Sequence, residues 1–153
     1  MPPSRRSNTY FHPLSLRNAT KPTCDRDIAA KKLIIYFPGG GYCLPALPGY
    51  FSQLEALSED IKGHGKPVAV LFAKYDLAPN AQWPRQLEQA VAILRYALQT
   101  IGRQPSDIVL QGDSSGGNLA LALLSHLAHP HPQVTVPRLL LDGTLGGTLL
   151  LSP

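Results

Sequence analysis

The stretch "DIVLQGDSSGGNLALALLSHLA", residues 107–128, decides the fold of this chain of 153 residues. It opens on a short apolar run typical of a buried strand, passes through glycines and serines, and continues as an apolar segment of helical length. A strand that turns at once into a helix is the repeating unit of parallel α/β sheets. The stretch therefore predicts an α/β fold. If this is correct, strands and helices should also alternate in the remaining chain.

The other apolar segments alternate in the same way. Runs apolar on both sides suit strands buried on both faces of a parallel sheet, and four occur, at 33–37, 68–73, 107–112 and 148–152. Helical spacing separates them. It appears from Phe51 to Ile61 with Gly63 as a stop, from Leu87 to Ile101 with Pro84 in the first turn and Gly102 at the exit, and over 115–128. The last segment is apolar nearly all round and is expected to be the most buried of the three helices.

These elements predict a three-layer α/β domain with a mostly parallel sheet and helices on both faces. We expect residues 32–153 to form this domain and residues 1–31 to be a weakly structured N-terminal arm, in which only "TYFHPL" is strand-like. Residues 1–32 carry seven Lys/Arg against two Asp, a net charge of +5, whereas the remainder carries −1. The basic residues are not clustered or interleaved with aromatics, so a solvated terminus is favoured over nucleic-acid binding.

Composition narrows the class further. The N-terminus has arginines but no following apolar region, so it does not read as a secretory signal, and no run is long enough to span a membrane. Cys24 and Cys43 are too few for a disulfide framework or a zinc cage. We therefore expect a cytoplasmic protein without a metal, and the oligomeric state stays open.

Within the opening stretch, residues 112–116 spell G-x-S-x-G around Ser114, between a strand and a helix. This is the context of a nucleophile elbow, where a sharp turn exposes the serine side chain above the sheet. Gly112 and Gly116 allow strand and helix to approach closely, and the helix N-terminus favours developing negative charge. The frame makes Ser114 the candidate nucleophile and leaves Ser115 as a backbone N–H donor.

A second motif, "YFPGGGYC" at 36–43, ends the first predicted strand of the domain with Gly39, Gly40 and Gly41. Three glycines can simply make a flexible turn. Alternatively, their N–H groups can point into the site and complete an oxyanion hole. The pairing of this loop with the elbow is far more specific than either motif alone.

Three segments in order, "IIYFPGGGYC", "AKYDLAPNAQWPRQLEQAVAILRYAL" and "GDSSGGNLALAL", resemble the α/β-hydrolase fold-3 family, the hormone-sensitive-lipase-like esterases and lipases. The resemblance covers about residues 32–153. It implies a carboxylic-ester hydrolase that acts on a small-molecule ester through an acyl-serine intermediate, with no metal or cofactor. It also implies that this chain is an incomplete, N-terminal part of such a fold, lacking later strands and the cap, either as a truncated gene product or as an incomplete gene model.

By the same resemblance, Ser114 is the nucleophile, and the N–H groups of Gly40, Gly41 and Ser115 form the oxyanion hole. The remaining motif positions form a structural frame: Gly39, Gly112, Asp113, Gly116, Gly117 and Asn118. Two positions depart from the family pattern. Pro38 stands where a histidine usually precedes the glycines, and Asp76 replaces the arginine of Y-R-L-A-P, which puts the anchoring of the glycine loop in question.

The partners of a nucleophilic serine are not evident. In α/β-hydrolases the triad runs serine, acid, histidine along the chain. After Ser114 the only acidic residue is Asp142, and His126, His129 and His131 all precede it. We therefore expect the isolated chain to be catalytically incomplete. The alternative is a non-catalytic module that binds a partner through an open sheet edge; a trypsin-like protease, suggested by "GDSSGG", is excluded by the alternation of strands and helices.

Overall fold

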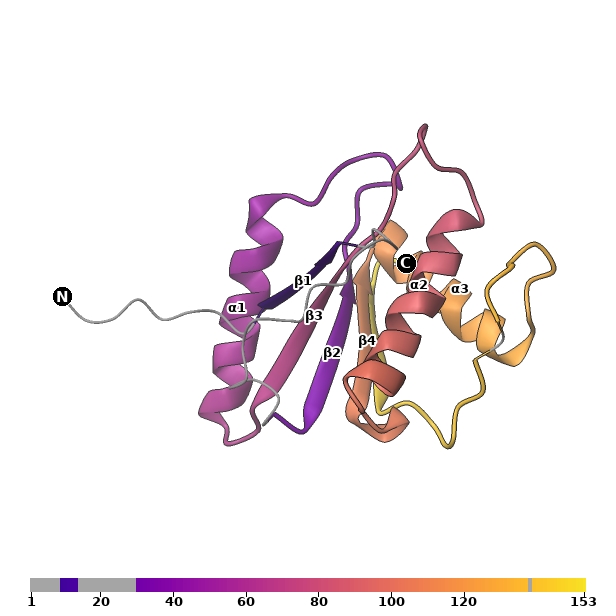
Figure 1. Ribbon diagram of the computed structural model, residues 1–153. Helices are drawn as coiled ribbons and strands as arrows, with labels where there is room; N and C mark the ends of the chain where they lie inside the picture. Colours follow the sequence, from indigo (N-terminus) through magenta and orange to yellow (C-terminus); the bar gives the residue numbers. More distant parts are fainter. Residues whose placement is uncertain (1–8, 14–29, 138) are drawn as a thin grey trace.

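The computed structural model describes residues 9–13, 30–137 and 139–153, which form a five-stranded sheet with helices on both faces. Every neighbouring pair of strands is parallel, and the spatial order is β1-β3-β2-β4-β5 (Figure 1). The strands are β1 (Thr9–Pro13), β2 (Lys32–Phe37), β3 (Val68–Lys74), β4 (Ile108–Asp113) and β5 (Gly147–Leu151). Their carboxyl ends meet at one edge of the sheet, where α/β proteins place their sites.

The four predicted strands are confirmed, each end lying within one residue of the predicted run. The predicted N-terminal arm lies largely outside the described residues. Within it, Thr9–Pro13 form β1, the weak strand signal, which pairs with β3 from Val70 to Lys74. Strand β1 lies at one edge of the sheet and β5 at the other.

Alternate side chains of β2, β3 and β4 enter two separate cores, as expected for a sheet covered on both faces. In β2, Leu33, Ile35 and Phe37 join the core beneath α2 (Arg85–Arg95) and α3 (Ser115–Ala128). Ile34 and Tyr36 join the core beneath α1 (Pro48–Gly63). Figure 1 shows α1 on one side of the sheet and α2 and α3 on the other. The predicted three-layer α/β architecture is confirmed.

The helix boundaries follow the predicted signals closely. Helix α1 ends at Gly63, as predicted. Pro84 precedes α2 as its N-cap, one residue earlier than the predicted first turn. A π-helical turn at Tyr96–Thr100 continues α2, and Gly102, with φ of 79°, lets the chain leave it.

The prediction that α3 is the most buried helix is wrong. Seven of the eleven residues of α2 are buried, against seven of the fourteen of α3. The connection that follows α3 crosses the outer side of α2, where Thr135 donates two hydrogen bonds to Glu88 Oε1. Those bonds also lower the pKa of Glu88. Helix α3 is covered in part, because the segment 139–148 lies along its second half while its Leu121 is 42% exposed.

No helix in the described part of the chain is long and apolar enough to cross a membrane.

Candidate active site

Ser114 occupies a strained turn between β4 and α3. Its φ of 48° and ψ of −123° lie in a region that non-glycine residues rarely adopt, and such strain persists only where neighbours enforce it. The Ser114 N–H donates to the Leu151 carbonyl at 2.8 Å, so β5 holds the turn from one side. The Ser114 carbonyl accepts from Asn118 N–H at 2.9 Å, so the first turn of α3 holds it from the other.

The predicted glycine frame has a steric cause. A Cβ on Gly116 would lie 2.0 Å from the Phe37 carbonyl oxygen, and one on Gly112 would lie 2.4 Å from the Gly116 carbonyl oxygen. Strand β4, helix α3 and the end of β2 therefore touch through backbone atoms. Gly117 is less restricted, since a Cβ there would lie 3.1 Å from Pro153 atoms.

The glycine loop begins at the end of β2, the strand beside β4. Gly40 and Gly41 have φ of 130° and 59°, and the Gly40 carbonyl accepts the N–H groups of Cys43 and Leu44 at 3.0 and 2.9 Å. A Cβ on Gly40 would meet the Leu44 carbonyl oxygen at 2.7 Å. The loop is therefore a tight, hydrogen-bonded turn. Ser115 begins α3 at the same edge of the sheet, among first-turn N–H groups that have no acceptor within the helix.

Asp113, the residue before Ser114, connects the elbow to this loop. Its Oδ1 accepts the Gly39 N–H at 3.1 Å and the Tyr36 hydroxyl at 2.5 Å, and its Oδ2 accepts the Tyr50 hydroxyl at 3.1 Å. A Cβ on Gly39 would lie 2.4 Å from Oδ2 and 3.0 Å from the Asp113 carbonyl oxygen, so a larger residue there would displace the carboxylate. Burial, followed by the hydrogen bond to Asp113, raises the pKa of Tyr36 far above its usual range, and burial also raises the pKa of Tyr50. Both hydroxyls are protonated donors at neutral pH.

The two departures from the family pattern lie in different environments. The Pro38 carbonyl accepts the buried Tyr75 hydroxyl at 2.5 Å, and the Ala78 N–H donates to the Tyr42 carbonyl at 2.8 Å. The segment at 75–79 therefore holds the glycine loop. Asp76 is exposed and lies 3.4 Å from Arg85 Nε, so its side chain pairs with α2.

The histidines that follow Ser114 are not placed to act on it. His126 is 4% exposed and lies twelve residues along α3, a rise of about 18 Å. Its Nδ1 accepts the His131 N–H at 2.9 Å, and the Nδ1 of His131 accepts the Gln133 N–H at 3.3 Å. In both rings Nδ1 is thus engaged by a backbone N–H within the segment that follows α3. His129 is the C-cap of α3, and Asp142 is exposed in the connection before β5.

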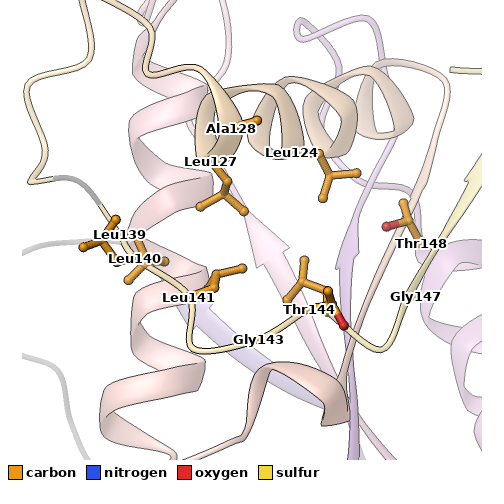
Figure 2. Close-up of a pocket in the computed structure, with 11 residues that line it drawn as sticks. Leu124, Leu127, Ala128, Leu139, Leu140, Leu141, Gly143, Thr144, Gly147 and Thr148 are labelled. Atoms are coloured by element: carbon orange, nitrogen blue, oxygen red, sulfur yellow. The ribbon is translucent and has the colours of Figure 1, made fainter.

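A large cavity lies away from this site. It has a volume of about 550 Å³, between the second half of α3 and the segment 139–148 (Figure 2). Figure 2 shows Leu124 and Leu127 directed from the helix toward Leu141 and Thr144. Its lining residues carry no ionisable side chain, so this cavity offers no catalytic group. Across the described ranges, no three His, Cys, Asp or Glu side chains gather where they could hold a metal ion.

A parallel sheet between helical layers, with a strained serine turn beside a glycine loop at its carboxyl edge, defines the α/β-hydrolase class. A family model described as alpha/beta hydrolase fold matches residues 34–153. The chain belongs to this family, in its fold-3 branch of esterases and lipases, as the motifs predicted.

Individual relatives agree with this assignment. The chain is 35% identical over 107 residues to arylacetamide deacetylase of Mus musculus. The aligned region covers 67% of this chain and 26% of the relative. It is 28% identical over 131 residues to steryl acetyl hydrolase 1 of Saccharomyces cerevisiae, covering 83% and 28%. A solved esterase from the bacterial hormone-sensitive lipase family superposes with a TM-score of 0.58 at 30% identity, covering 84% of this chain and 38% of that one. The chain thus spans about a quarter of the length of these two curated relatives.

Proposed function

We propose that this chain carries the nucleophile and the oxyanion-binding loop of a carboxylic-ester hydrolase, with Ser114 as the nucleophile. The observation that carries the proposal is the Asp113 carboxylate, which is covalently next to Ser114 and hydrogen-bonded to Gly39, the residue before Gly40. A serine and a loop joined in this way keep a fixed separation, which acyl transfer requires. The name of one relative, steryl acetyl hydrolase 1, supports an ester as the substrate class.

The reaction proceeds through an acyl-serine. Ser114 Oγ attacks the ester carbonyl carbon as its proton passes to a base, and the carbonyl electron pair moves onto oxygen. The N–H groups of Gly40, Gly41 and Ser115 stabilise that oxyanion, and removing one such donor from a complete enzyme costs on the order of 10²–10³ in rate. The intermediate then expels the alcohol, which takes up a proton, and leaves the acyl group on Ser114. Water, deprotonated by the base, attacks the acyl group and releases the carboxylic acid.

The lack of a base for Ser114 within residues 1–153 limits the hydrolytic activity that we expect of this chain alone. His126 lies about 18 Å from the elbow along α3, and no acid followed by a histidine comes after Ser114 within residues 1–153. Triad knockouts cost about 10⁶ in turnover and leave roughly 10³–10⁴ over water, which comes from the oxyanion hole and binding. We infer that the isolated chain shows no more than this residual activity.

The test uses p-nitrophenyl butyrate with the whole chain, following p-nitrophenolate release and the intact protein mass. We expect one acyl group to accumulate slowly on Ser114 without sustained turnover, because deacylation lacks a base as well. Ser114→Ala should abolish the adduct, and the matched Ser115→Ala variant should keep it. An adduct that survives in Ser114→Ala would contradict the assignment of Ser114 as the nucleophile. Sustained turnover that depends on Ser114 would contradict the inference that this chain has no base for it.

A second candidate function, a binding module, is favoured by the exposed edge of β5. Within the described residues β5 pairs only with β4, and its Leu149 and Leu151 are 48% and 43% exposed. An apolar edge strand without charges is a template for another strand. This function predicts concentration-dependent association in sedimentation velocity that Leu149→Lys reduces several-fold and Leu140→Lys, at a 75% exposed position outside the strands, does not. A chain that stays monomeric at every concentration would rule out pairing of β5 with a second copy of this chain.

A further inference from the structure

The Asp113 carboxylate contacts both ends of the segment that contains the oxyanion glycines. This segment, residues 38–47, leaves the sheet after β2 and enters α1 at Pro48. Gly39 lies at its beginning, and Tyr50 lies in the first turn of the helix that follows it. The hydrogen bonds from Gly39 N–H to Oδ1 and from Tyr50 Oη to Oδ2 therefore close the segment into a loop around one carboxylate.

The two tyrosines that complete this contact come from opposite sides of the core. Tyr36 is 3% exposed and belongs to the sheet, and its ring lies 5.6 Å from that of Phe72. Tyr50 is half-buried on α1, with its ring centroid 6.0 Å from that of Tyr36. Among the described side chains, no Lys or Arg forms an ion pair with Asp113. The orientation of the carboxylate therefore depends on neutral, directional donors rather than on a mobile cation.

We propose that Tyr50 is a positioning residue, through which helix α1 fixes the Asp113 carboxylate and thereby the N–H groups of the glycine loop. The hydroxyl acts on Oδ2, and the same carboxylate presents Oδ1 to Gly39. Without Tyr50, only the Oδ1 contacts with Tyr36 and Gly39 orient the carboxylate, so the partner of the Gly39 N–H is less firmly held. The consequence for hydrolysis rests on the proposed function, whereas the effect on the loop does not.

The middle of the loop has separate supports, which makes the effect of Tyr50 local. Tyr42 Oη donates to Asn118 Oδ1 at 2.8 Å, and the Tyr42 carbonyl accepts from Ala78 N–H. Loss of the Tyr50 bond should therefore let the glycines move about Tyr42 while strand, helix and elbow keep their structure. The amides of Cys43 and Leu44, which donate to the Gly40 carbonyl, report this movement.

The experiment is hydrogen–deuterium exchange on the whole chain for Tyr50→Phe, Asp113→Ala and Asp113→Asn. Hydrogen bonds to a charged group are among the stronger ones, so we expect exchange over residues 38–47 to rise about tenfold in Tyr50→Phe. Asp113→Ala should give at least this rise. Asp113→Asn should restore most of the protection, because its Oδ1 still accepts from Gly39 and its Nδ2 can donate to the Tyr50 oxygen. Tyr96→Phe, after the end of α2, is the matched control and should leave the loop unchanged.

Two outcomes overturn the proposal: unchanged exchange over 38–47 in Tyr50→Phe, or an equal rise throughout α1 and β4, which would indicate a packing role only. The rate of Ser114 acylation by p-nitrophenyl butyrate separates this proposal from the function it rests on. Faster loop exchange in variants of a protein that is never acylated at Ser114 supports the positioning role and contradicts the hydrolase. Normal acylation of Ser114 with unchanged loop exchange in Tyr50→Phe supports the hydrolase and contradicts the positioning role of Tyr50.

Discussion

Gly116→Ala is expected to abolish the native fold or to lower its free energy of unfolding by at least about 3 kcal/mol. The added Cβ would lie 2.0 Å from the Phe37 carbonyl oxygen and 2.7 Å from that of Pro38. Both atoms are backbone, so no side chain can rotate away. Helix α3 must shift off β2, which separates the buried residues Leu119 and Leu123 from Phe37 in their shared core. Urea unfolding followed by circular dichroism measures the loss.

Gly49→Ala is the matched control for Gly116→Ala. Gly49 lies in the first turn of α1, and nothing lies within 4 Å of the position its Cβ would take. Alanine there removes only glycine's helix penalty, so we expect a change of up to about 1 kcal/mol in the stabilising direction. Comparable unfolding midpoints for the two variants would show that α3 does not depend on close backbone contact with β2.

Gly40→Ala is expected to slow the acylation of Ser114 by about 10²–10³-fold while leaving the fold intact. Gly40 has φ of 130°, which alanine adopts only with strain, and its Cβ would meet the Leu44 carbonyl oxygen at 2.7 Å. Relief of that contact is expected to turn the loop and to redirect the N–H groups that we propose bind the oxyanion. The measurement is the rate at which the acyl adduct forms on Ser114, read from the intact protein mass under excess ester.

Gly65→Ala controls for the strain alone. Gly65 also has a positive φ, of 74°, but lies after α1, and nothing lies within 4 Å of the place that a Cβ would occupy. We expect this variant to lose roughly 1 kcal/mol of stability and to acylate at the rate of the unchanged protein. If Gly40→Ala also acylates at that rate, the glycine loop does not bind the oxyanion.

Local patterns predicted most of the architecture. The apolar runs at 33–37 and 68–73 predicted strands because burial on both faces of a parallel sheet favours apolar side chains throughout. The runs at 107–112 and 148–152 also predicted strands, although β5 is largely exposed. The error over α3 has a tertiary cause. Its apolar surface suggested full burial, but the chain after it contacts α2 through Thr135 and Glu88 and then follows the second half of α3. No local pattern encodes that path.

The candidate site divides in the same way. Ser114 and its glycines were predicted from spacing, because an elbow between strand and helix needs small residues at fixed positions. Tyr36 and Tyr50 were missed. In the sequence, Tyr36 is one residue of an apolar run and Tyr50 is one residue at the start of a helix, so neither position indicates a contact with Asp113. Their shared acceptor, Asp113, is more than sixty residues away from both.

The sequence by itself determined the order of the elements, the class of fold and the serine turn, because these depend on periodicity and on glycine at short range. Only the tertiary structure decided which groups meet. Parallel pairing placed β2 beside β4 and so brought Gly39 against Asp113, and the packing of α1 on that face added Tyr50. Hydrogen bonds between distant segments depend on crossing angles and register, which single-residue patterns do not carry. The elbow "GDSSGG" is thus a local feature whose geometry depends on contacts with β2, α1 and β5, which are distant in the chain.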